Sequence, residues 1–319
     1  MVAAACAASA EPTQKEISIP LIVRQIPRVN TYKADVSIGF GNLQRLPIAF
    51  DTGSAGLHVF AAAKLDAPGS GIDCTATPVS FTVGNPGRVT YSGVICNAVL
   101  HFAGFTTPTA VPLAYLTSAS CTPNNPGCKL PNLNNPKAHG GVYGVFGAGI
   151  TGAMPVQNPL LGMYQSYSIE LTHGGGRVVL GGAAESDAAQ FPLAPGTRTG
   201  AKWQIGQACL FVNGTATRSC LGISFDTGNG VPWIRASDAA TIPQQNGLVI
   251  PNTRIGFAPP GAASAATTVI AGSAFANRIK VQPANKAPLA NSGIEAFFEH
   301  VVTYDNLNGR ISIAPKKDR

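Results

Sequence analysis

The sequence predicts an all-β protein built from two related lobes, and three observations carry this prediction. Of the 319 residues only 12% are charged, while 36 are glycine and 25 are proline. This composition favours many short strands joined by tight turns over long, charged surface helices. The second observation is a hydrophobic fraction of 45%, which is typical of a folded globular chain. The third is an internal repeat.

The repeat consists of two copies of a seven-residue segment. The first copy, Ile48–Ser54, reads IAFDTGS, and the second, Ile223–Asn229, reads ISFDTGN. They lie 175 residues apart, counted from Asp51 to Asp226. That spacing is too long for a solenoid repeat and fits two domains of one kind, each contributing one acid.

The sequence around each copy follows the same plan. Strand-like sequence rich in β-branched and aromatic residues precedes the two acids, over 31–40 and 202–214. An apolar pair closed by glycine follows each, predicted as Val145–Gly147 in the first half and as Val269–Gly272 in the second. The two halves are therefore expected to share one strand order.

Between the halves, the sequence predicts connecting elements. Residues 149–165 are expected to form a loop or short helix, and residues 166–182 a hairpin that turns at His173–Gly176. We place the lobe boundary here, with a first lobe over 13–165 and a second over 166–319.

The first residues, MVAAACAASAEPT, resemble the end of a signal peptide with a cleavage site after Ala8-Ser9-Ala10. Residues 1–12 are therefore predicted to be a signal-peptide remnant and the protein to be exported. The alternative is a lipid anchor at Cys6. No apolar run is long enough to span a bilayer.

Six of the seven cysteines fall into local pairs. Proximity predicts three disulfides, the alternative being buried free thiols in a cytosolic protein. The pairs are Cys74 with Cys96, Cys121 with Cys128, and Cys209 with Cys220.

Charge and histidine content indicate neither nucleic acid nor metal as a partner. The net charge is +7, but the 22 Lys and Arg residues are scattered and do not cluster with aromatic residues. The five histidines lack the spacing of a metal site and are expected to be surface or satisfied, partly buried residues. They are His58, His101, His139, His173 and His300. We expect no cofactor and a monomer.

Two acids presented by identical turns suggest one chemistry. If the turns face each other, the carboxylates are too close to ionise together, and the pair holds a single proton. Such a pair can take a proton from a water molecule while it protonates a carbonyl oxygen, which allows metal-free attack on a peptide bond. The glycines let the backbone pass closely, and the Thr52 and Thr227 hydroxyls can brace the turns.

At this point the sequence resembles the pepsin-like aspartic proteases, in which two such motifs stand in two related β lobes separated by a cleft. The resemblance extends from about Thr31 to Pro315 through YKADVSIG, GVFGAG, RVVLGG, VIAGSAF and the closing strands FFEHVVTYDNLNGRISIAP. It implies that Asp51 and Asp226 are the catalytic pair. The supporting residues that it implies are Thr52, Gly53, Ser54, Thr227, Gly228 and Asn229.

The turns differ in one supporting residue. The resemblance implies that Ser54 bonds the outer oxygen of Asp51. Asn229 stands at the equivalent place in the second turn, where the family usually has Thr or Ser, and its amide can also donate a hydrogen bond.

Substrate handling departs further from the family pattern. A flap hairpin in the family carries a tyrosine that bonds a tryptophan shortly after the first turn. Here Val83 takes the tyrosine position and His58 the tryptophan position, with Phe81 and Tyr91 as alternative flap residues. These replacements predict a flap that closes over the substrate more weakly or with a different shape.

The second lobe is expected to be short, and two segments are expected to be surface loops. The turn-rich stretch 234–266 and the distance from Asp226 to Gly272 predict few substrate contacts from this lobe and an open cleft. The loops are predicted over 280–293 and over 121–141, the latter closed by Cys121 and Cys128.

Two functions are compatible with these residues. The favoured hypothesis is an aspartic endopeptidase that cleaves peptide or protein substrates with apolar residues near the scissile bond, at acidic pH. The alternative is a binding or inhibitory protein of the same fold that has lost turnover, because fold alone does not determine function.

Overall fold

The computed structural model describes residues 16–27, 30–84, 88–152, 154–197, 202–273, 278–283 and 286–317. The predicted signal-peptide remnant and Cys6 lie outside these residues. Half of the chain is strand and 7% is helical, which confirms the all-β prediction. No described helix is long and apolar enough to cross a membrane.

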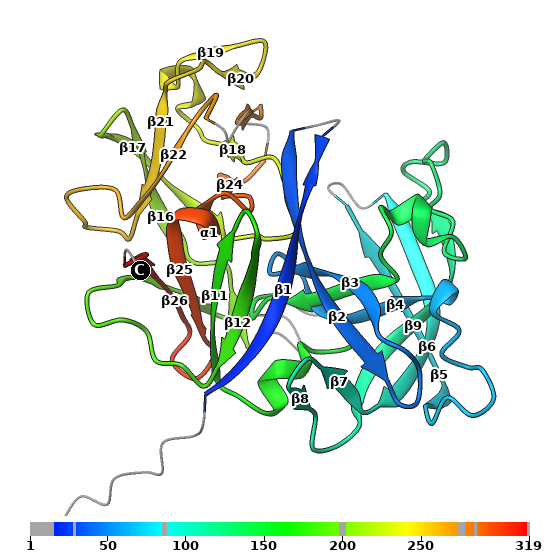
Figure 1. The fold of residues 1–319 in the computed structure, drawn as a ribbon. Helices are drawn as coiled ribbons and strands as arrows, with labels where there is room; N and C mark the ends of the chain where they lie inside the picture. Colours follow the sequence, from blue (N-terminus) through cyan, green and yellow to red (C-terminus); the bar gives the residue numbers. More distant parts are fainter. Residues whose placement is uncertain are drawn as a thin grey trace, which may run out of the picture.

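The larger sheet runs through the centre of the molecule and into the first half of the chain (Figure 1). In spatial order its strands are β13 (Ala189–Pro192), β26 (Arg310–Pro315), β25 (His300–Asp305), β11 (Ser166–Thr172), β12 (Gly175–Leu180), β1 (Ile17–Ile26), β2 (Thr31–Phe40), β3 (Leu46–Asp51), β10 (Gly144–Ala148), β4 (Ala55–Phe60), β9 (Val111–Cys121), β6 (Val89–Ala98) and β5 (Asp73–Val83). A short ribbon of β7 (Leu100–Phe102) and β8 (Phe105–Thr106) joins at β2.

The second sheet forms the lobe of the second half. Its strands in spatial order are β19 (Gln244–Gln245), β20 (Leu248–Val249), β23 (Lys280–Val281), β18 (Trp233–Arg235), β24 (Leu289–Asn291), β17 (Thr215–Ser224), β16 (Gln207–Val212), β21 (Arg254–Ala258) and β22 (Thr267–Ile270). The remaining elements are the pair β14 (Ala194–Pro195) and β15 (Trp203–Gln204), the helix α1 (Ala296–Glu299), and the 3-10 turns η2 (Ala61–Ala63), η3 (Pro136–His139), η4 (Pro159–Gly162) and η5 (Ala239–Thr241).

The two halves repeat one strand arrangement, as the sequence predicts. In the first half β3 pairs in parallel with β10, which pairs antiparallel with β4. In the second half β17 pairs in parallel with β24, which pairs antiparallel with β18. In each half, the strand that precedes the acid therefore pairs with a strand from much later in the chain: β3 with β10, and β17 with β24.

The counterpart of β10 is β24, and by strand register Val145–Gly147 corresponds to 291–293, so the assignment to Val269–Gly272 is wrong. Residues 267–270 form β22, which pairs only with β21 in a hairpin. The prediction of a surface loop over 280–293 fails for the same reason, because Ala290 and Asn291 are buried in β24. The estimate of a short second lobe rested on that misplaced segment.

The connecting elements agree with their predictions. The hairpin of β11 and β12 turns between Thr172 and Gly175, and η4 lies within 149–165. Both hairpin strands belong to the larger sheet, since β12 pairs with β1 and β11 pairs with β25. The lobe boundary at 165/166 is therefore crossed by this sheet, and the division into two lobes at that residue stays a prediction.

Aromatic side chains fill the core beneath both acids. Phe50 stacks on Phe146 at 5.7 Å in the first half, and Phe225 meets Phe191 edge-on at 5.2 Å in the second. All four are at most 2% exposed. Burial of side chains this large contributes about 2–3 kcal/mol each and fixes the strands that end at the turns.

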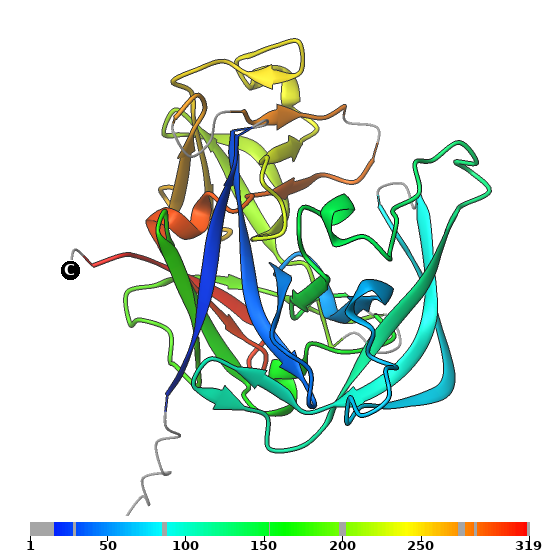
Figure 2. The same ribbon diagram turned by 45° about the vertical axis from the view of Figure 1, so that its right-hand side comes forward.

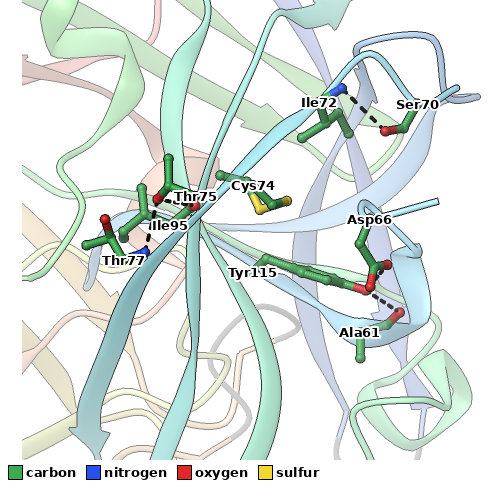
Figure 3. Close-up of a disulfide and its surroundings, with 10 residues drawn as sticks. Ala61, Asp66, Ser70, Ile72, Cys74, Thr75, Thr77, Ile95 and Tyr115 are labelled. Carbon is green, nitrogen blue, oxygen red and sulfur yellow. Dashed lines mark hydrogen bonds between the residues drawn. A yellow bond between two sulfur atoms is a disulfide. The ribbon is translucent and has the colours of Figure 1, made fainter. Parts of the chain in front are cut away.

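All three predicted disulfides are present, joining Cys74–Cys96, Cys121–Cys128 and Cys209–Cys220. Figure 3 shows the surroundings of Cys74, where the Tyr115 hydroxyl donates to Asp66 Oδ1 at 3.0 Å and Thr75 donates to the Ile95 carbonyl. Disulfides form and persist in oxidising compartments, so the pairing agrees with an exported protein.

Candidate active site

The structure brings the two repeated turns together between the halves of the chain. Asp51 is the last residue of β3, and Asp226 follows β17 by two residues. Asp226 is only 8% exposed. The two motifs that lie far apart in the sequence therefore form one site.

The two threonines of the turns bond each other reciprocally. The backbone N–H of Thr52 donates to Thr227 Oγ1 at 3.1 Å, and the N–H of Thr227 donates to Thr52 Oγ1 at 3.0 Å. Each hydroxyl in turn donates at 2.8 Å to a carbonyl of the other half, Thr52 to Phe225 and Thr227 to Phe50. Because all of these groups are buried, the four bonds fix the turns against each other.

The two glycines leave the space that the carboxylates occupy. A Cβ atom on Gly53 would overlap the Asp226 carboxylate, and one on Gly228 would overlap the Asp51 carboxylate. Each glycine also donates its N–H to the Oδ1 atom of the acid two residues before it, at 2.8 Å. Glycine is thus required at the third position of each DTG motif because the carboxylate of the opposite acid lies against it.

The outer oxygens of the two acids have different donors. Ser54 Oγ donates to Asp51 Oδ2 at 2.7 Å, as the resemblance implies. At the second turn the donor is Asn291, whose Nδ2 lies 2.6 Å from Asp226 Oδ2. Asn229 does not bond the acid; its Nδ2 donates to Asn291 Oδ1 at 2.8 Å. Asn229 therefore orients Asn291, which makes the bond to Asp226 that was expected of Asn229.

Asn291 is a residue that the sequence analysis did not identify. It reaches Asp226 because β24 pairs in parallel with β17, with Asn291 opposite Ser224. The sequence feature that could have identified Asn291 is the apolar pair Leu289-Ala290 immediately before Asn-Ser-Gly. The similar pair Val269-Ile270 lies closer to the second turn in the sequence and was chosen instead.

Two further residues hold the second turn from the first half. Lys33 Nζ donates to the carbonyl of Gly228, and Thr31 Oγ1 donates to the carbonyl of Gly230. Both side chains come from β2, the central strand visible beside β1 in Figure 1. Strand β2 therefore clamps the second turn to the first half.

The carboxylates are electrostatically coupled. The pKa of Asp226 is raised to about 7, chiefly by burial and also by the charge of Asp51 and a hydrogen bond between the two carboxyls, while the bonds from Asn291 and Gly228 oppose the rise. The pair therefore keeps one proton over a range of pH in which an ordinary aspartate has none. A group of this kind can act as base and acid in one step.

β5 and β6 form a long hairpin at the position predicted for the flap, here called the flap, and Figure 2 shows it curving along the molecular edge beside β9. Phe81 pairs with Tyr91 across the hairpin, and their rings stack at 6.0 Å. The Phe81 ring lies 4.6 Å from the His58 ring. Val83 is 38% exposed. Phe81, and not Val83, is thus the flap residue that contacts the position after the first turn.

His58 differs from its prediction as a satisfied or surface residue. It is 5% exposed, and its Nε2 atom has no hydrogen-bond partner among the residues that the structure describes. Burial lowers its pKa to about 4, although the negative charge of Asp51 opposes the shift. His58 is therefore neutral at pH values well above 4.

A separate cavity of about 760 Å³ lies in the second half between β21, β22 and the region of α1. Its lining includes Phe211, Thr267, Glu299 and His300 but neither aspartate. Within the part of the chain that the structure describes, no three His, Cys, Asp or Glu side chains are grouped to hold a metal ion.

Searches with the whole sequence found no matching family model and no matching curated protein.

Proposed function

We propose that this protein is an aspartic endopeptidase of the pepsin-like type. The observation that carries the proposal is the coupled pair of Asp51 and Asp226, braced by Thr52 and Thr227 and shaped by two glycines. Carboxyls that serve only as local turn residues need neither the reciprocal bracing nor a shared proton.

The pair would act on a peptide bond through one water molecule. Because burial raises the pKa of Asp226, we assign the shared proton to that residue and the role of base to Asp51. Asp51 takes a proton from water as its oxygen attacks the carbonyl carbon, and Asp226 gives its proton to the carbonyl oxygen. The resulting diol then loses the amine, which receives a proton from the pair as the C–N bond breaks.

The proposed substrate is an extended peptide with apolar residues near the scissile bond. The flap supports this choice because Phe81 and Tyr91 pack against an apolar cluster that includes Phe60, Val79 and Leu116. The disulfides support an exported enzyme that meets protein or peptide substrates outside the cytosol.

The test is hydrolysis of a mixed peptide library between about pH 3 and 8 by the wild type, Asp51→Asn and Asp226→Asn. We expect cleavage by the wild type and at least a ~10³-fold loss in each variant, since each removes one half of the proton-transfer pair. Asp66→Asn, which alters an exposed acid, is the control and should keep wild-type activity. A folded wild type that cleaves nothing would support the alternative of a binding protein without turnover.

A further inference from the structure

We infer that His58 is a positioning residue, which in its neutral form holds the flap against β4 through Phe81 and releases the flap when it becomes charged. The inference rests on the proposed function for its effect on catalysis, but its structural part can be tested without activity.

His58 lies between the first turn and the flap. His58 lies on β4, seven residues after Asp51, and its neighbours across the strands are Val145 on β10 and Ala114 on β9. Its ring faces Phe81 at 4.6 Å. The flap thus packs on the His58 ring through Phe81.

Nε2 of His58 is buried without a partner among the described residues. Burying this atom costs some free energy when the imidazole is neutral. The cost is larger when the ring is charged, because both ring nitrogens then carry N–H groups that need acceptors. A charged ring beneath Phe81 would need water. Phe81 packs against the ring, which is only 5% exposed, so we expect water to reach it when the flap moves.

Asp51 is the acid that acts on His58, and it favours the charged form. The flap contributes the uncharged Phe81 and, behind it, Tyr91, whose pKa is raised by burial so that it stays neutral. Strands β9 and β10 contribute Ala114 and Val145. Burial outweighs Asp51, because the pKa of His58 falls to about 4.

The consequence is a lower limit to the working pH that does not come from the carboxyl pair. Above about pH 4 the neutral ring supports Phe81, and below it the charged ring opens the flap. Flap opening weakens the hold on the substrate, so KM should rise more than kcat falls.

The test compares His58→Phe, which keeps an aromatic ring but cannot be charged, with the wild type and with His101→Phe. His101 is a half-buried histidine on β7 that bonds Thr106 and serves as the control. Because the neutral fraction of a group with a pKa of about 4 falls about fourfold from pH 5 to 3.5, we expect KM to rise about fourfold over this range in the wild type and the control. His58→Phe should show no such rise. The inference is overturned if His58→Phe keeps the wild-type rise, which would assign it to the carboxyl pair.

Amide hydrogen exchange in β5 and β6 without substrate separates this inference from the proposed function. After correction for intrinsic exchange, protection should fall about tenfold between pH 5 and 3.5 in the wild type and remain constant in His58→Phe. If no peptide is cleaved but this difference appears, the proposed function fails and the link between His58 and the flap stands. If peptides are cleaved but flap protection is independent of pH in the wild type, the inference fails and the proposed function stands.

Discussion

Asn291 donates a hydrogen bond of 2.6 Å to the outer oxygen of Asp226, although 65 residues of chain separate them. The Nδ2 atom of Asn229 donates a hydrogen bond to Oδ1 of the same Asn291 amide. The second turn thus has the same number of donors to its acid as the first, but one of them comes from β24.

Removal of the Asn291 amide should raise the pKa of Asp226. The bond favours the ionised carboxylate, so its loss in Asn291→Ala makes the proton harder to remove. We expect the alkaline limb of kcat/KM to move up by about one pH unit and kcat to fall roughly tenfold. Asn229→Ala should shift the limb in the same direction but less. An alkaline limb at its wild-type pH in Asn291→Ala would contradict this account.

Loss of either threonine hydroxyl should destabilise the protein. Thr52→Val and Thr227→Val each remove two buried hydrogen bonds and leave their partners unsatisfied, so each should cost about 2–4 kcal/mol of unfolding free energy. Because both hydroxyls belong to one hydrogen-bond network and either loss loosens the turns that the other holds, the double variant should cost less than the sum. Urea denaturation measures all three. Thr172→Val, on an exposed turn, is the control and should change stability by less than about 0.5 kcal/mol.

A methyl group on either glycine of the turns should abolish activity. In Gly53→Ala or Gly228→Ala the new Cβ overlaps the opposite carboxylate, so the acids must separate. We expect at least a ~10³-fold loss of kcat/KM and a clear fall in melting temperature. Gly127→Ala has open space around its Cβ position and should behave as the wild type in both measurements.

The stability of the protein should decrease as pH rises from about 4 to about 7. The pKa of Asp226 in the folded state, about 7, lies above its value in the unfolded chain, so folding is favoured while the carboxyl is protonated. This contribution is complete below the unfolded pKa and lost as pH rises through the folded pKa. It is on the order of a few kcal/mol.

Asp226→Asn isolates that contribution in urea denaturation at several pH values. The variant should show a flatter dependence of unfolding free energy on pH than the wild type. The comparison is needed because buried Glu295 also has a raised pKa and acts in the same direction, while His58, with its lowered pKa, acts in the opposite one. Parallel curves for the two proteins would show that Asp226 titrates normally.

Local sequence patterns predicted most of the fold and the first turn. The repeated IAFDTGS and ISFDTGN segments located both acids, and composition and turn residues indicated strands. The cysteine pairs also followed from proximity, because each closes a short stretch of chain. These features depend on residues close together in the sequence.

Features that depend on distant strand pairing were not predictable in the same way. The strand β24 is only three residues long, and nothing local distinguishes it from the apolar pair at 269–270. The flap register was misjudged for a related reason, since a shift of two residues exchanges Val83 for Phe81 on the same face. The clamps from Lys33 and Thr31 join residues about 200 positions apart.

The order of strands in the larger sheet has a consequence for biosynthesis. Strand β26, residues 310–315, pairs with both β13 and β25, and β25 pairs with β11. A nascent chain on the ribosome therefore cannot close this sheet until residue 315 has left the exit tunnel. The Tyr304 hydroxyl, which donates to the Phe225 carbonyl beside the second acid, arrives equally late. A nascent chain that stops short of residue 300 therefore lacks β25 and β26, and with them the Tyr304 hydroxyl that bonds the backbone beside the second acid.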